Sequence, residues 1–374
     1  MQYKIHNTLI LVVFIFVTLI FNSVDAKVTG PCANCHTMHN SQDGSAVAYD
    51  FDGTSFTKTT TPKSNLLIYN CLGCHTGINT ATTTTPYVFS LSEPTFGVNT
   101  LSGGNFYWVR TDDIKGHNVF SDNSDGNLSK APGDIGFYTC GTNSCHANIH
   151  GTASGTGFSN LNERQGCTKC HMVTTNGYPT GYHHANDGTG TKYVDSATKG
   201  WFRFLAGHIT GNGYGVVGIE DGDWQYTKSD TDHNEYLGSV VNGNYGFVGL
   251  GNTMTGYCTG CHGVYHQDQQ SGGNWIRHPS DSVLPNSGEY AAISTTYNPN
   301  VPVARPDTFL NSLGNTPNST VQADRDMVMC LSCHVAHGSP YDDLLRWDYS
   351  SMIAGGGSNE TGCFACHTQK DTNP

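Results

Sequence analysis

The sequence predicts a fold of mostly irregular backbone, with short helices at recurring cysteine–histidine motifs and little β structure. The same motif, two cysteines followed by a histidine, occurs seven times along 374 residues. The segments between the motifs are rich in glycine, asparagine and threonine, and turns such as Asn298-Pro299 and Thr316-Pro317 interrupt them. Only 36% of the residues are hydrophobic, so side chains alone give a weak basis for a large core.

The 14 cysteines define the motifs, because each belongs to a pair whose second member is followed directly by histidine. Cys-x-x-Cys-His is the attachment signature of a c-type haem, in which both thiols form thioethers and the histidine becomes the proximal iron ligand. A disulfide framework does not need these histidines, and a zinc site needs two pairs at one metal, which an odd number of pairs does not supply. We therefore predict seven covalent haems c. The thioether cysteines and proximal histidines are Cys32, Cys35 and His36; Cys71, Cys74 and His75; Cys140, Cys145 and His146; Cys167, Cys170 and His171; Cys258, Cys261 and His262; Cys330, Cys333 and His334; and Cys363, Cys366 and His367.

The number of predicted haems also constrains the architecture. Each haem has only about 50 residues around it, so the porphyrins must form much of the core and lie close together in a chain. We expect one heptahaem domain over residues 27–374. Its interval 172–257 is the exception, because glycine-rich apolar stretches at 213–219 and 244–250 suggest a small β-containing insertion there.

The first 26 residues have the pattern of a secretory signal peptide. Lys4 precedes an apolar run from Leu9 to Phe21, and small residues stand before the expected cleavage site at Lys27. An uncleaved anchor is the alternative, although the run is short against the roughly 20 residues that a membrane span needs. We expect export through the periplasm to the cell surface or the extracellular space. The net charge of −12 argues against nucleic acid as a partner.

Histidines are also plentiful enough to supply the sixth ligand of each iron. Outside the signal peptide and the proximal positions ten remain, so we expect bis-histidine coordination at most sites. His39 lies three residues beyond His36 on one side of a helical turn, so it cannot close the iron that His36 binds. It is either idle or a ligand to another iron. The ten candidates are His39, His117, His150, His183, His184, His208, His233, His266, His278 and His337.

The motifs resemble those of the OmcS-like outer-surface multihaem c-type cytochromes, a family that polymerises into conductive filaments, or nanowires. The matching stretches extend along most of the chain. They are CANCHTMHNS at 32–41, GGNFYWV and KGHNV within 103–119, CHANIH at 145–150, CHGVYH and NWIRHP within 261–279, CLSCHVAHGS at 330–339 and CFACH at 363–367.

The resemblance implies distal ligands and a mode of assembly. In that family the second histidine of the first motif binds a haem of the next subunit, and the counterpart haem here is the one at Cys330, Cys333 and His334. Such a head-to-tail contact generates a filament when it does not close. The alternative is that the terminal segment folds back and His39 binds a haem of its own subunit. The implied distal ligands are His39, His117, His150, His266, His278 and His337.

The chain departs from the family pattern by its seventh haem, at Cys167, Cys170 and His171, and by the long segment that follows. We predict His184 as the distal ligand there because its loop is the nearest. His183, His208 and His233 stay open as alternatives.

The predicted function is extracellular electron transfer through the haem chain, without enzymatic activity. The expected partners are further copies of the chain, redox partner proteins and extracellular acceptors such as metal oxides. Two alternatives remain: a monomeric periplasmic or envelope cytochrome, and a multihaem oxidoreductase with one open haem. All seven motifs end in histidine, so the sequence does not mark a catalytic haem.

Overall fold

The structure is a computed structural model that describes residues 30–51, 55–63, 66–120, 166–171, 174–175, 178–179, 192–194, 201–205, 215–239, 252–262, 278–356 and 361–372. The predicted signal peptide, the third motif and the apolar stretch at 244–250 lie outside these ranges. So do five distal candidates, His150, His183, His184, His208 and His266.

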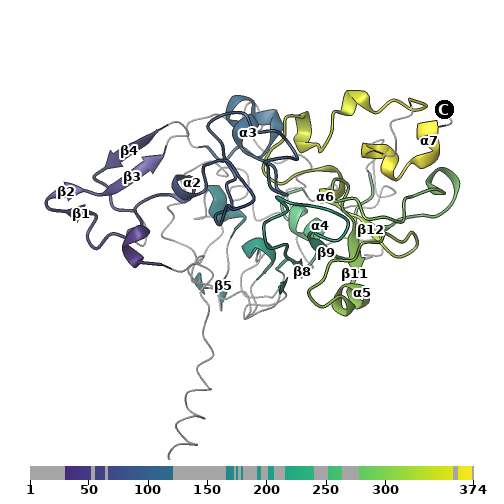
Figure 1. Ribbon diagram of the computed structural model, residues 1–374, viewed down its shortest axis with the longest axis horizontal. Helices are drawn as coiled ribbons and strands as arrows, with labels where there is room; N and C mark the ends of the chain where they lie inside the picture. Colours follow the sequence, from purple (N-terminus) through teal and green to yellow (C-terminus); the bar gives the residue numbers. More distant parts are fainter. Residues whose placement is uncertain are drawn as a thin grey trace, which may run out of the picture.

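The molecule is elongated, and the two ends of the described chain lie at its opposite ends (Figure 1). One end carries two hairpins, β1 (Ser41–Gln42) with β2 (Ser45–Ala46) and β3 (Ala48–Phe51) with β4 (Phe56–Thr59). The other end carries η12 (Gly362–Ala365) and α7 (Thr368–Thr372). The first and last motifs are therefore far apart in space.

The helices are short, and every described motif begins in one of them. The motif helices are η1 (Cys32–Asn34), α2 (Cys71–Cys74), η5 (Gly166–Lys169), α4 (Met254–Cys258), α6 (Cys330–Cys333) and η12. The remaining helices are α3 (Tyr107–Thr111), η3 (Asp113–Lys115), η6 (Phe202–Phe204), η9 (Gly288–Tyr290), α5 (Asp307–Ser312), η10 (Asp342–Leu344) and η11 (Tyr349–Ser351). The predicted backbone, mostly irregular with short helices at the motifs and little β structure, is confirmed. None of the described helices is long and apolar enough to cross a membrane.

One six-stranded sheet lies in the half of the molecule nearer the C-terminus, with strands of two to four residues (Figure 1). Its order is β10 (Ser282–Val283), β12 (Met327–Val328), β11 (Ala304–Pro306), β9 (Glu235–Gly238), β8 (Gly218–Ile219) and β7 (Tyr193–Val194). All pairs are antiparallel except β9 with β11. A separate hairpin joins β5 (Thr174–Thr175) and β6 (Tyr178–Pro179). Strands do occur within 172–257, but β7, β8 and β9 share their sheet with strands from 282–328.

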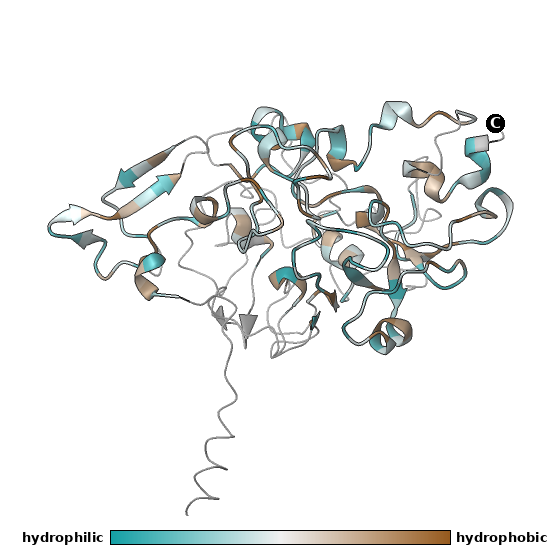
Figure 2. Ribbon diagram, viewed as in Figure 1, coloured by the Kyte–Doolittle hydropathy of each residue, from teal (hydrophilic) through white to brown (hydrophobic). Residues whose placement is uncertain are grey.

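The core consists of small clusters rather than one apolar layer, and hydrophobic and hydrophilic residues alternate along most of the ribbon (Figure 2). One cluster packs Phe51 of β3 and Phe89 against Phe106, Val109 and Phe120, which ties the N-terminal hairpin to α3. Part of the sheet interior is ionic instead.

In that ionic part, Arg305 of β11 is fully buried and donates to Glu235 of β9 at 2.7 Å and to Asp326. A buried ion pair is well compensated only when further hydrogen bonds satisfy it. Arg305 meets this condition because it also donates to the carbonyl oxygens of Asn318 and Thr320.

Candidate haem-binding sites

A single helical turn places the histidine of each described motif. In all six, the histidine N–H donates to the carbonyl of the first cysteine, four residues earlier, at 2.9 to 3.1 Å. This bond sets both cysteines and the histidine around one turn, as a thioether-bound haem requires. Two turns are capped as well, because the Asn70 side chain accepts from Gly73 N–H and the Thr253 side chain from Gly256 N–H.

The cysteines are free thiols at all twelve described positions, so no described pair forms the disulfide that an even cysteine count would otherwise suggest. The described residues also contain no group of three or more His, Cys, Asp or Glu side chains placed to hold a bare metal ion.

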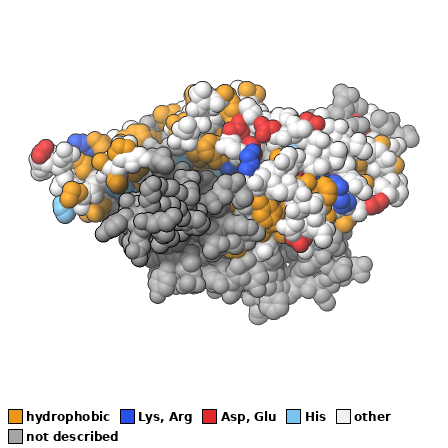
Figure 3. Space-filling view, turned by 60° about the horizontal axis from the view of Figure 1, so that its bottom comes forward, with side chains coloured by type: hydrophobic (Ala, Val, Ile, Leu, Met, Phe, Trp, Pro, Cys, Tyr) orange, Lys and Arg blue, Asp and Glu red, His pale blue; other side chains and the backbone are white. Residues whose placement is uncertain are grey.

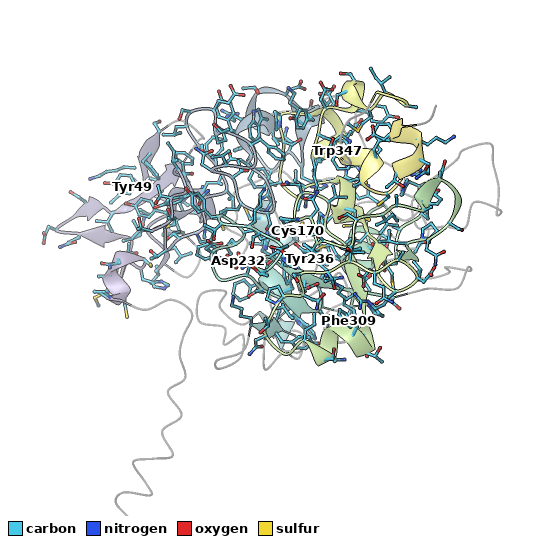
Figure 4. The ribbon with its side chains drawn as sticks, turned by 45° about the vertical axis from the view of Figure 1, so that its right-hand side comes forward. Tyr49, Cys170, Asp232, Tyr236, Phe309 and Trp347 are labelled. Atoms are coloured by element: carbon cyan, nitrogen blue, oxygen red, sulfur yellow. The ribbon has the colours of Figure 1, made fainter. Side chains whose placement is uncertain are left out.

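Successive motifs are neighbours in space. The pKa of the Cys74 thiol is raised by burial and then by the neighbouring Cys35. A hydrogen bond between their thiols joins Cys71 to Cys167. The Tyr257 hydroxyl, next to Cys258, donates to the carbonyl of Cys170 at 2.8 Å. Cys170 itself lies near the centre of the molecule (Figure 4).

The sequence of neighbours continues to the C-terminus. A hydrogen bond joins the thiols of Cys258 and Cys330, where α4 packs against α6. Burial raises the pKa of the Cys333 thiol to about 12, and the nearby thiols of Cys363 and Cys366 add to the rise. The six described motifs therefore form a chain in their sequence order.

Three pairs of histidine rings lie at the separation that one iron between them would need. An imidazole nitrogen binds a transition metal at about 2 Å and the ring centre lies about 1 Å further, so two rings on opposite faces of one iron have centres about 6 Å apart. The observed centre-to-centre distances are 6.1 Å for His117 and His262, 5.8 Å for His171 and His337, and 6.2 Å for His278 and His367.

Six of the described motif and candidate histidines use Nδ1 for a hydrogen bond inside the protein. The acceptor is a backbone carbonyl 2.8 Å away for five histidines: Pro86 for His75, Ala336 for His117, Arg203 for His171, Pro279 for His278 and Asp343 for His334. His367 differs because its acceptor is the carboxylate of Glu289, at 3.0 Å. A bond at Nδ1 fixes the tautomer in which Nε2 can bind a metal.

Two distal candidates, His117 and His337, are held by a junction of three backbone segments, which we call the glycine junction (residues 103–105, 115–117 and 336–339). The N–H of His117 donates to the carbonyl of His337 at 3.1 Å, and the N–H of His337 donates to the carbonyl of Gly103 at 2.7 Å. Gly104 has φ +81°, and a Cβ there would lie 2.0 Å from the Gly338 oxygen. A Cβ on Gly116 would lie 2.2 Å from the His337 oxygen. Only glycine allows this close approach.

The ring of His337 is stacked on Phe106, with ring centres 4.6 Å apart and planes 25° apart, and its centre lies 5.8 Å from that of His171. Burial lowers the pKa of His337 to about 3, with smaller contributions from His171, His117 and His75. The neutral ring is the form that binds a metal. Its Nδ1 is buried and has no hydrogen-bond partner among the described residues.

His233, an alternative for the His171 iron, is engaged at both ring nitrogens. Nδ1 lies 3.1 Å from the carbonyl of Ser229 and Nε2 lies 3.2 Å from Glu235. The ring is fully buried and stacked 3.6 Å from Tyr297. His233 therefore belongs to the ionic interior of the sheet and is not free to bind iron.

The remaining sites are only partly described. His184 lies outside the described residues, so the described histidine opposite His171 is His337. His39 and His334 are both exposed, and neither has a histidine ring opposite it among the described residues. His39 follows η1 directly before β1, at the hairpin end of the molecule (Figure 1).

These residues fit a covalently bound haem with two axial histidines. The turns present two thiols and a histidine together, the ring pairs have the spacing for one iron, and Nδ1 bonds orient the rings. The sequence analysis did not predict the groups that hold the histidine rings in place, which are the Nδ1 acceptors and the glycines beside the histidines. The carbonyl acceptors have no side-chain signature, whereas the glycines of GGN, KGH and HGS stand beside the ligand histidines in the sequence and were the available signal.

A family model described as a doubled CXXCH motif matches residues 322–372, which contain the last two motifs. The solved structure titled "Outer Membrane Cytochrome S Filament from Geobacter Sulfurreducens" is similar at 20% identity and a TM-score of 0.49, over 87% of this chain and 85% of that one. A cryo-EM structure of the OmcS nanowires from Geobacter sulfurreducens is similar at 19% identity and a TM-score of 0.48, over 86% and 84%. No curated protein sequence matches the chain. The C-terminal part of the chain thus carries the doubled CXXCH motif.

Proposed function

We propose that this chain is an exported multihaem c-type cytochrome that transfers electrons outside the cell. The observation that carries the proposal is the set of three histidine pairs about 6 Å apart, each containing the histidine of a cysteine motif. When bound, a haem supplies an iron that accepts and releases one electron. The protein would hold it through two thioethers and, at these three sites, through two histidines, which would leave no position for a substrate.

From these pairs we propose the ligand histidines: His117 with His262, His337 with His171, and His278 with His367. For the His171 iron we propose His337 rather than the sequence-based choice of His184, because the centre of the His337 ring lies 5.8 Å from that of His171. His184 itself lies outside the described residues. We propose seven haems in total, with the third motif included, and an electron path that follows the motifs in sequence order.

We further propose that the chain assembles head-to-tail, with His39 binding the His334 iron of the next subunit. Resemblance to the filament-forming family suggests this bond, and the positions of the two residues support it. Both are exposed, and His39 lies at the end of the molecule opposite to the C-terminal motifs. Hydrophobic side chains lie among polar and charged ones at the tapered hairpin end (Figure 3).

Exposed apolar residues lie beside His39 in the sequence and in the C-terminal part of the chain. Met38, 80% exposed, stands beside His39, and on the C-terminal side Tyr349 and Ile353 are 70% and 63% exposed. Burying such surface at a junction would stabilise the contact. Extracellular acceptors such as metal oxides, and redox partner proteins, are the expected electron-transfer partners.

The proposal is tested by the haem content and ligation of the secreted protein. We expect an intact mass that exceeds the polypeptide by seven haems, and an oxidised spectrum that is low-spin throughout. The reduced protein should not bind carbon monoxide readily, and negative-stain images should show filaments. Fewer than seven haems would contradict the stoichiometry, and one high-spin haem per chain would contradict the absence of an open site.

A further inference from the structure

The Nδ1 acceptors divide the described ligand histidines into two groups. Five donate to neutral backbone carbonyls, and His367 alone among those with a described acceptor donates to a carboxylate, that of Glu289. A carboxylate that accepts the Nδ1 proton makes the ring a stronger electron donor to its metal, and second-layer hydrogen bonds are a known control of haem potentials.

We propose that Glu289 lowers the reduction potential of the C-terminal haem, at Cys363, Cys366 and His367, below that of the haems at His75, His171 and His334, where Nδ1 donates to a backbone carbonyl. The inference rests on the proposed function, since it assumes that His367 binds a haem iron. A more basic imidazole stabilises the ferric over the ferrous state, so this iron is the hardest of the four to reduce.

The fold positions Glu289 for this contact. Gly288, with φ +63°, starts the short helix η9, a conformation that glycine adopts without strain. The Thr368 hydroxyl, next to His367, donates to the backbone carbonyl of Glu289 at 3.2 Å and accepts from the N–H of Ala292 at 3.2 Å. These bonds fix η9 on α7, so the carboxylate faces the ring.

Tyr290 and Lys370 flank the contact between Glu289 and His367. The Tyr290 ring packs against the His367 ring, with centres 5.0 Å apart. A cation opposes the effect, because Lys370 Nζ lies 3.8 Å from the second carboxylate oxygen. This is a surface pair with Glu289 31% exposed, so the opposition is weak.

The test is a spectroelectrochemical titration of the haem-loaded mature protein. Glu289→Gln keeps an oxygen that can accept the Nδ1 hydrogen bond but removes the charge. We expect the titration component of the C-terminal haem to move upward, with a tenfold change in its ferric-to-ferrous ratio at a fixed ambient potential, or about 59 mV for one electron. Lys370→Gln should move the same component downward. Asp348→Asn removes an exposed carboxylate at the same end that bonds only Ser350, and should leave the curve unchanged.

The site is identified by His278→Ala, whose high-spin signal should belong to the component that Glu289→Gln shifts. If Glu289→Gln and Lys370→Gln both retain seven low-spin haems and neither shifts the titration, the inference is wrong although the proposed function stands. A shift in a component other than the one marked by His278→Ala also overturns it. Failure of the proposed function itself shows differently, as missing haem or a high-spin iron in the unmodified protein.

Discussion

The hairpin end and the glycine junction solve the same problem, holding a histidine beside a haem, in opposite ways. At the hairpin end, Cys32, Cys35 and His39 are exposed, and the fixed points are the bridge from His36 to Leu67 and the stacked rings of Tyr49 and Tyr69. At the junction, three backbone segments meet through four backbone hydrogen bonds and one from His117 Nδ1 to the carbonyl of Ala336, and they hold two candidate ligands together. The junction places two candidate ligands within one chain, whereas the hairpin end presents an exposed candidate ligand at one end of the molecule.

We infer from this difference that iron binding and folding depend on each other at the glycine junction and are independent at the hairpin end. His117 and His337 share a backbone hydrogen bond, so disturbing one disturbs the other. His39 shares no such bond with another ligand among the described residues. Four substitutions test this contrast, ordered by how strongly each should affect the subunit itself.

Gly116→Ala should have the largest effect. The new methyl group would lie 2.2 Å from the His337 oxygen and 2.3 Å from Val109 Cγ2, so the junction must open. Both His117 and His337 would move, and a clash of this kind costs more than about 3 kcal/mol of stability. We expect two high-spin haems and a lowered unfolding temperature, measured by electron paramagnetic resonance and thermal melting.

Gly222→Ala is the control for that change, because a Cβ at Gly222 meets no atom within 4 Å. It should leave both the spin state and the unfolding temperature unchanged. A Gly116→Ala protein with every haem low-spin would show that the junction does not position the ligands.

Arg305→Leu should destabilise the fold without changing any haem. It removes the shared cation of Glu235 and Asp326, both fully buried, and breaking such a pair costs about 3–5 kcal/mol. Arg325→Leu is the matched control, since Arg325 contacts the same Asp326 at 2.8 Å but is partly exposed, and should cost about 1 kcal/mol or less. Denaturant unfolding, followed at wavelengths where the haems do not absorb, measures the loss of stability in both variants. Equal losses for the two variants would contradict the importance of burial here.

Contacts between residues close together in the sequence could be predicted, and contacts between distant residues could not. The motif turns follow from residues four apart, so the cysteines of α2 and α6 and their short helices were predictable. The contact of His171 with His337 was not, because the bridge of Gly104 and Gly338 beside His337 joins residues far apart in the sequence. Strands of two residues, such as β8, are too short to show a period. His233 has the sequence features of a ligand, and only its bonds to Ser229 and Glu235 reveal a structural role.

His337→Ala should remove one axial ligand and leave the rest of the chain folded. The His171 iron then becomes high-spin and binds carbon monoxide when reduced, at one site per chain. The cavity left beside Phe106 should lower the free energy of unfolding by about 1–2 kcal/mol. His184→Ala is the comparison variant and should keep all haems low-spin. The opposite result, a high-spin site in His184→Ala and none in His337→Ala, would restore the sequence-based choice.

His39→Ala should have the smallest effect on the subunit, because His39 is exposed. We expect unchanged thermal stability and a full set of haems. In the proposed head-to-tail bond, however, the His334 iron of the next subunit loses its sixth ligand at each junction. Filaments should therefore be short or absent, and one haem per chain should become high-spin. Gln42→Ala, in the exposed strand β1 three residues away, removes a side chain from the same surface and should assemble normally. If His39→Ala forms normal filaments with every haem low-spin, another residue must be the sixth ligand of the His334 iron. The hairpin end would then not supply a ligand to the next subunit, and the proposed contrast with the glycine junction would be wrong.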